Sequence, residues 1–365
     1  MKLIKFLIYT IIVLFIILFS LFFYDMYYSA KETDYTIEPV AVIQETVKPI
    51  AVSDEFEDTE ILTIEPPEEK IYNQYEDVYI STNKFYYFQL DDYSKLIYNE
   101  LESKKESLKK GNETINLPSK IGEAIENGAS MEAIFSVAVN AFENDNPEVF
   151  YFDASKLVLY YEKNSFGKYK IYLKNDEEYS NYLVDGFNSK EDIDIAQNKI
   201  DEMVSKIASN IGTLNTDYDK ILYIHDWLVE NAKYDETLNK TNKDSIYGAF
   251  VEGEAVCGGY SKAFKYLLDK LNIECIIVQG IGSTSNAQEN HAWNYVKLNN
   301  EWYGVDCTWD DPIIIGDLRY YTEQKYYTYF LKGQNVFNED HSPFETFYGT
   351  NLQINYPTLS YEDYR

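Results

Sequence analysis

Apolar residues recur along the chain with helical spacing in some stretches and as short strand-like runs in others. Helical spacing predicts helices over residues 92–110, 132–143, 192–210, 217–231 and 258–271. Runs rich in aromatic and β-branched residues predict strands over residues 150–152, 156–161, 168–173, 274–280, 291–296 and 302–306. Because helices precede an antiparallel hairpin in the second half of the chain, the pattern predicts an α+β fold.

The chain begins with an uninterrupted apolar run over residues 6–24, which is long enough to cross a bilayer. Lys2 and Lys5 precede this run, and positively charged flanks favour the cytoplasmic side. We therefore predict a transmembrane signal anchor over residues 1–24, with the remaining chain on the extracytoplasmic side of the cell membrane. A cleaved signal peptide is the alternative interpretation.

Charge and proline content divide the rest of the chain. Residues 25–75 contain thirteen acidic residues, three lysines and four prolines, which predicts an acidic disordered tether. We expect a smaller N-terminal α+β region over residues 76–189, a catalytic core over residues 190–340 and a C-terminal tail over residues 341–365. The net charge of −29 argues against a nucleic-acid partner, because phosphate binding requires clustered lysine and arginine.

A cysteine at the start of a predicted helix is the first candidate for chemistry. Cys257 directly precedes the apolar stripe of residues 258–271, where the positive end of the helix dipole favours a thiolate. Gly258 follows it and carries no side chain that would block a substrate backbone. The alternative is a small buried core residue, which is the usual role of a cysteine without a disulfide.

The predicted hairpin brings a histidine and a carboxylate together. Asn299 and Asn300 form a favourable two-residue turn, and this register places Trp293 opposite Asp306. His291 and Asp306 then share one face as diagonal neighbours, roughly 7–8 Å apart at the backbone. We expect the carboxylate to accept the imidazole Nδ1–H, which leaves Nε2 to take a thiol proton.

The other cysteines and histidines are assigned structural roles. The hairpin register turns Cys307 to the apolar face, and Cys275 lies inside a predicted buried strand. His225 is predicted to be a hydrogen-bonded helix residue, since its neighbour Asp226 does not face it on a helix. His341 lies in a predicted loop that could cover the cleft. No spacing suits a zinc or calcium site, so we predict no metal and no cofactor.

Three segments together resemble the transglutaminase-like superfamily, above all its bacterial membrane-anchored members. They are Val256–Tyr260 (VCGGY), Asn290–Asn294 (NHAWN) and Val305–Asp310 (VDCTWD). The resemblance covers roughly residues 190–335. It implies a papain-like transglutaminase core, in which the helix that begins with the nucleophile packs on an antiparallel sheet.

The resemblance also implies a role for each motif residue. Cys257 would be the nucleophile, His291 the base and Asp306 the orienting carboxylate of a triad that forms a thioester. The oxyanion would be held by the main-chain N–H of Cys257 and by a second donor. The candidates for contact with the oxyanion or the substrate are Tyr247, Gly258 and Trp293.

The leading hypothesis is an extracytoplasmic thiol enzyme acting on amide bonds of proteins or peptides, cell-wall peptides included. If an amine resolves the thioester the enzyme is a transferase, and if water does it is a cysteine peptidase or amidase. The triad is common to both. A hypothesis of another class is a cell-surface binding or scaffold module with a relic triad, which the aromatic-rich N-terminal region and the long tether would fit.

Overall fold

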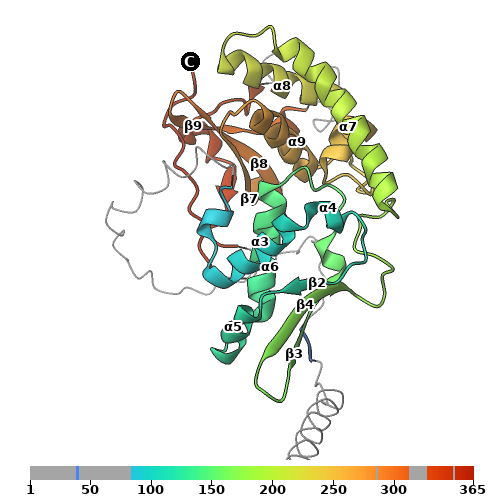
Figure 1. Ribbon diagram of the computed structural model, residues 1–365. Helices are drawn as coiled ribbons and strands as arrows, with labels where there is room; N and C mark the ends of the chain where they lie inside the picture. The colour runs from blue at the N-terminus through green and yellow to red at the C-terminus, as the bar shows by residue number, and fades with distance from the viewer. Residues whose placement is uncertain (1–37, 41–83, 285–286, 312–326, 348–349) are drawn as a thin grey trace, which may run out of the picture.

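Two antiparallel four-stranded sheets, each accompanied by helices, make up the part of the protein that the structure describes (Figure 1). The computed structural model describes residues 38–40, 84–284, 287–311, 327–347 and 350–365. In Figure 1 the first sheet lies at the bottom in green, and the second lies above it in orange and red. The candidate chemistry belongs to the second sheet and its helices.

The first sheet and its helices confirm most of the elements predicted before residue 190. The strands are β1 (Glu38–Val40), β2 (Ile115–Leu117), β3 (Leu157–Lys163) and β4 (Tyr169–Asn175), in the order β1-β3-β4-β2. The helices are α3 (Asp92–Ser103), α4 (Lys105–Leu108), α5 (Gly122–Glu126) and α6 (Met131–Asp145). The apolar side chains of α6 are buried in the core of this region, as their helical spacing predicted.

Residues 150–152, which we predicted as a strand, form a turn instead. All three side chains are buried against other aromatic rings. The ring of Phe150 lies 5.6 Å from that of Phe187, and Phe152 makes an isolated bridge to Leu183. The prediction was wrong because three consecutive apolar residues were taken as a strand, whereas their burial comes from aromatic packing in a turn.

The predicted transmembrane run over residues 6–24 lies outside the described residues. Among the helices that the structure describes, none is both long and apolar enough to cross a membrane. Within the predicted tether, Glu38–Val40 forms β1 and pairs with β3 from Glu38↔Tyr161 to Val40↔Leu159. Strand structure at this point, where we expected disorder, requires only main-chain hydrogen bonds, which a polar sequence can supply.

The second sheet and its helices confirm the predicted α+β arrangement. The strands are β7 (Cys275–Ser283), β8 (Gln288–Leu298), β9 (Glu301–Val305) and β10 (His341–Pro343), in the order β10-β7-β8-β9, beside a short parallel pair of β5 (Lys233–Tyr234) and β6 (Glu254–Ala255). The helices are α7 (Lys190–Ile211), α8 (Asp217–Asn231), the π-helical turn η5 (Gly248–Glu252), α9 (Cys257–Lys270), α10 (Cys307–Asp310) and α11 (Gln334–Phe337). Helix α9 packs on β7 and β8 (Figure 1).

The hairpin of β8 and β9 has the predicted register. Asn299 and Asn300 form the turn with positive φ angles of 54° and 66°, which suit a two-residue hairpin connection. The ladder runs from Leu298↔Glu301 to Asn294↔Val305, so the next position would pair residue 293 with residue 306. The register therefore places His291 and Asp306 on the same side of the hairpin.

The two regions are joined by buried polar contacts. Asp145, at the end of α6, accepts hydrogen bonds from the main-chain N–H groups of Tyr86 and Tyr87 at 3.0 and 2.9 Å. The Tyr86 hydroxyl donates to the carbonyl of Ile277 in β7 at 2.7 Å. Residues ahead of α3 are thus fixed to both α6 and the second sheet, and the two regions pack as one unit.

We expect Asp145 to make the stability of the protein depend on pH. Burial raises its pKa to about 7, although hydrogen bonds from Tyr86 and Tyr87 oppose this effect. The folded state therefore binds a proton that the unfolded state releases above about pH 4, so this group's contribution to stability falls as pH rises from about 4 to 7. Urea unfolding should show wild type losing stability relative to Asp145→Asn between pH 5 and pH 8. An unchanged difference would contradict the assignment.

Candidate active site

Cys257 is the first residue of α9 and is partly exposed. Gly259 permits the close approach of the preceding chain, because a Cβ there would lie 2.3 Å from the Lys243 carbonyl oxygen. Gly258 is also partly exposed, so the surface beside the thiol is not covered by a side chain of that residue. The two glycines thus explain how Cys257 can begin a buried helix and still be partly exposed.

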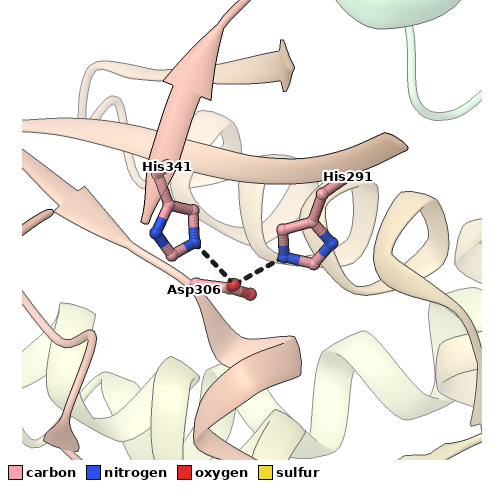
Figure 2. Close-up of side chains that lie close together, drawn as sticks. All are labelled: His291, Asp306 and His341. Carbon is pink, nitrogen blue, oxygen red and sulfur yellow. Dashed lines mark hydrogen bonds and ion pairs between the residues drawn. The ribbon is translucent and has the colours of Figure 1, made fainter. Parts of the chain in front are cut away.

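His291 and Asp306 are in direct contact, as the register predicted. Figure 2 shows the imidazole aimed at the carboxylate, with His291 Nε2 donating to Asp306 Oδ2 at 2.6 Å. The predicted nitrogen was wrong, because we expected Nδ1 to face the carboxylate. Nδ1 is therefore the nitrogen left to interact with Cys257, which contributes to the raised pKa of His291.

The Asp306 carboxylate is held by four hydrogen bonds. Oδ1 accepts the main-chain N–H groups of Thr308 and Trp309 at 2.9 and 3.2 Å and so caps α10. Oδ2 accepts His291 and, at 3.1 Å, Nε2 of His341. Burial works against ionisation, but the charge of His291 and hydrogen bonds from both histidines hold the pKa of Asp306 well below its usual range.

The His291 imidazole favours its protonated form. Burial alone would lower its pKa, but the charge and hydrogen bond of Asp306, together with the hydrogen bond to Cys257, raise the pKa to about 10. The ring is also stacked on Trp309, with centroids 4.9 Å apart. The pair can therefore hold an imidazolium next to the thiol and fix the plane of the ring.

His341, for which we predicted a loop, belongs to strand β10 and contacts Asp306. On β10, His341 pairs with Gly282 of β7. On β8, at the other edge of β7, His291 pairs with Gly280. The two histidines therefore approach the carboxylate from opposite edges of β7. A Cβ at Gly282 would lie 3.2 Å from His291 Cβ, so a larger residue would press on that side chain. The alternating glycines in β7 are the sequence feature that could have indicated side chains meeting across this strand.

Three of these residues form a group that could hold a metal ion. One ligand atom each from His291, Asp306 and His341 lies within 4.8 Å of the others, and all three side chains are buried. Two imidazoles and a carboxylate suit zinc or iron. In this structure His291 and His341 each donate a hydrogen bond to Asp306. The sequence-based prediction of no metal stays a prediction.

Of the other predicted contact residues, Tyr247 is partly exposed and Trp293 is buried. The Tyr247 ring stacks on Phe150 at 5.9 Å and meets Phe187 edge-on at 5.6 Å, so it packs between the two regions. Trp293 is 1% exposed, with its ring 4.9 Å from that of His341. Burial of Trp293 argues against direct substrate contact, whereas the role of Tyr247 stays a prediction.

Tyr234 lies closer to the thiol and was missed from sequence. It ends β5, which pairs in parallel with β6 at Tyr234↔Ala255, two residues before Cys257. Burial and then the charges of Cys257 and, more weakly, Asp306 raise the pKa of Tyr234 far above its usual range. The hydroxyl therefore stays protonated and can donate a hydrogen bond.

The remaining cysteines and His225 have the predicted structural positions. Cys275 and Cys307 are buried. His225 is fully buried in α8 with Nε2 3.1 Å from Asp310 Oδ2. Its Nδ1 lies 3.0 Å from Asp226 Oδ1, so the prediction that Asp226 does not face it was wrong. The His225 imidazole thus lies between two carboxylates, one of them from the adjacent residue.

The segment that carries this site matches a known family. Residues 205–307, which include Cys257, His291 and Asp306, match the sequence profile described as the transglutaminase-like superfamily. This segment therefore belongs to that superfamily, and the protein contains a transglutaminase-like core of helices and antiparallel sheet.

Comparison with individual proteins gives more distant likenesses. Kyphoscoliosis peptidase from Homo sapiens is 24% identical over 159 residues, which are 40% of this chain and 24% of that protein. Kyphoscoliosis peptidase from Mus musculus is 24% identical over 155 residues, covering 40% and 23%. The chain thus spans about a quarter of the length of these curated relatives.

Two solved structures are also similar to part of the chain. A crystal structure of a TGase is 16% identical with a TM-score of 0.30, covering 47% of this chain and 49% of that one. The crystal structure of a candidate cysteine protease from Cytophaga hutchinsonii is 18% identical with a TM-score of 0.27, covering 39% and 52%.

Proposed function

We propose that this protein is a thiol enzyme acting on amide bonds of proteins or peptides through Cys257, His291 and Asp306. One observation supports this most strongly: the His291 imidazole is 2.6 Å from Asp306 Oδ2, and Cys257 is close enough to contribute to the raised pKa of that imidazole. Nucleophile, base and orienting carboxylate in this order are what acyl transfer through a thioester requires. Membership of residues 205–307 in the transglutaminase-like superfamily supports the same chemistry.

In the proposed reaction the Cys257 thiolate attacks the carbonyl carbon of a carboxamide or peptide bond. The C–N bond then breaks, and His291 Nδ1 gives its proton to the departing amine. Asp306 keeps the Nε2–H in place and stabilises the imidazolium between these steps. An amine or water next attacks the thioester, its proton passes to His291, and the C–S bond breaks to return the Cys257 thiolate beside the imidazolium.

The choice between amine and water separates a transferase from a peptidase or amidase. The experiment supplies a glutamine-containing protein with a labelled primary amine and measures label incorporation, released ammonia and new amino termini together. Incorporation indicates transfer, whereas ammonia without label, or new amino termini, indicates hydrolysis. The similarity to kyphoscoliosis peptidase favours including peptide cleavage among the readouts.

Cys257→Ala is the variant that tests the proposal itself. Every product should disappear, while circular dichroism and the urea midpoint remain close to those of wild type, because the residue is small and partly exposed. Cys307→Ala is the matched control, since that thiol is buried in the core and should leave product formation in place. Product formation by Cys257→Ala would contradict the role proposed for Cys257. Its absence in wild type over a broad substrate panel would count against an enzyme and favour the binding or scaffold module.

The oxyanion of the tetrahedral intermediate needs two donors. Cys257 supplies its own main-chain N–H, because the first N–H groups of a helix have no acceptor within the helix. We propose the Tyr234 hydroxyl as the second donor, since it remains protonated and the charge of Cys257 contributes to its raised pKa. Pairing of β5 with β6 fixes its main chain relative to α9.

Replacing Tyr234 by phenylalanine should lower kcat by about 10²-fold and leave KM nearly unchanged, because the donor acts mainly in the transition state. Steady-state kinetics on the substrate found above would measure both values. Tyr247→Phe is the matched control and should retain near wild-type kcat, because that ring packs against Phe150 and Phe187. Equal effects of the two substitutions would exclude Tyr234 as the donor.

We further propose that the enzyme acts outside the cytoplasm, with residues 6–24 as its membrane anchor. The support is the length of this apolar run and the lysines ahead of it. Cell-wall and surface peptides would then be the accessible substrates. Fractionation should find the full-length protein with membranes, and protease added to cells or spheroplasts should digest residues beyond the run. Protection of those residues would contradict this orientation.

A further inference from the structure

The third histidine of the chain lies against the proposed catalytic pair. His341 has a fully buried side chain, and Figure 2 shows it meeting His291 at the same carboxylate oxygen. Its Nε2 is 3.1 Å from Asp306 Oδ2, and its Nδ1 is 2.6 Å from Asp340 Oδ1. Two carboxylates therefore contact the two nitrogens of one imidazole.

These contacts define the protonation state of His341. An ionised carboxylate can only accept hydrogen bonds, so each ring nitrogen must donate one. An imidazole that donates from both nitrogens is an imidazolium with a full positive charge. In agreement, burial alone would lower the pKa of His341, but its hydrogen bonds to Asp306 and Asp340 raise it above the ordinary histidine value.

The surroundings hold this imidazolium in a fixed place. Its ring stacks on Phe337 at 4.1 Å and lies 4.5 Å from the Trp309 ring, which also stacks on His291. The Tyr329 hydroxyl donates to the other oxygen of Asp340 at 2.7 Å. The titratable groups that face His341 are Asp306, Asp340, His291 and Tyr329.

We propose that His341 is a positioning residue, which clamps Asp306 from the side opposite His291 and limits how strongly the carboxylate holds the His291 proton. The carboxylate oxygen Oδ2 divides its charge between two N–H donors, at 2.6 and 3.1 Å. A second positive charge across that oxygen also repels the His291 imidazolium. His291 must release its proton to a departing amine in every turnover, and excess basicity would slow this step.

The benefit of His341 to catalysis rests on the proposed function. The effect of His341 on the basicity of His291 does not. Removal of the His341 charge should make His291 more basic, and this can be measured without a substrate. The chain has three histidines, so ring ¹⁵N–¹H spectra of labelled protein contain three imidazoles. Substitution of His291 and His341 in turn assigns all three.

The experiment titrates these imidazoles by NMR in wild type and in His341→Gln, with EDTA present to exclude bound metal. In wild type, both ring nitrogens of His341 should be protonated at pH 7. In His341→Gln, the pH at which His291 loses its proton should rise by about one unit, the scale expected when a nearby like charge is removed. At pH 10 a smaller fraction of His291 should therefore be deprotonated than in wild type.

Two further variants separate charge from packing. Asp340→Asn keeps the ring but weakens its hold on the proton, so His291 should shift in the same direction by a smaller amount. Phe337→Leu removes the stacked ring and should lower stability without moving the His291 titration. An unchanged His291 titration in His341→Gln, or a wild-type His341 with one unprotonated nitrogen at pH 7, would overturn the proposal.

Where activity is found, the alkaline limb of kcat/KM should move with the NMR titration. A shift of the His291 titration in a protein without detectable amide-bond activity would support the clamp and count against the proposed function. Activity with no shift in either readout would support the function and reject the clamp.

Discussion

Asp306→Asn is expected to lower kcat by about 10⁴-fold, the scale observed when a triad carboxylate is replaced by its amide. The asparagine Nδ2 would donate to His291 Nε2 rather than accept from it. Nδ1 would then carry the remaining proton and could not take one from the Cys257 thiol. Steady-state kinetics of the purified variant would measure the loss, and a loss below tenfold would contradict the role given to Asp306.

Asp310→Asn is the matched control for this substitution. It removes a buried carboxylate from the same short helix, α10, but its histidine partner is His225 rather than His291. Both variants should lose stability because each leaves a buried imidazole with a weaker partner. The large loss of kcat should be confined to Asp306→Asn. A similar fall in both would mean that the effect comes from disruption of α10.

Lys265→Met is expected to cause the largest loss of stability, about 3–5 kcal/mol. Lys265 lies in α9 at 1% exposure, and its Nζ is 2.6 Å from Asp269 Oδ2. Burial raises the pKa of Asp269 to about 6, although Lys265 opposes this effect. Without the ammonium group the Asp269 carboxylate, 19% exposed, would keep only the weaker interaction with Lys270, and Asp145 would also lose a favourable charge.

Urea unfolding of Lys265→Met at pH 7 would measure this loss. Lys270→Met, at the exposed end of the same helix, should change the free energy of unfolding by less than about 1 kcal/mol. The double variant Lys265→Met with Asp269→Leu should recover much of the lost stability, because removing both members of a buried pair leaves no uncompensated charge. A double variant as unstable as the single one would show that packing, not charge, decides the effect.

Local sequence determined the parts of the site that were predicted successfully. The two-asparagine turn fixes the register of β8 and β9, and this register brings His291 to Asp306. Thr216 accepts the Asp219 N–H at 3.1 Å and starts α8 at the predicted residue. Both features depend on residues a few positions apart, so a single sequence is enough to predict them.

Long-range contacts determined the parts that were missed. His341 meets Asp306 from 35 positions away, through a three-residue strand that is too short to show alternation. A strand pair of two residues each places Tyr234 opposite Ala255, two residues before Cys257. The choice of imidazole nitrogen depends on a side-chain torsion, which the register does not specify.

The position of β10 matters for anyone who isolates the catalytic part of this protein. The family match ends at residue 307, whereas the strand that covers the outer side of β7 begins at residue 341. A fragment cut at the family boundary would expose the hydrogen-bonding edge of β7 to other molecules, and open edges of this kind promote aggregation. Insolubility of such a fragment would then result from the position of the cut and not from a property of the enzyme. A recombinant fragment should therefore include the strand from residue 341 to residue 343 and the chain that joins it to the sheet.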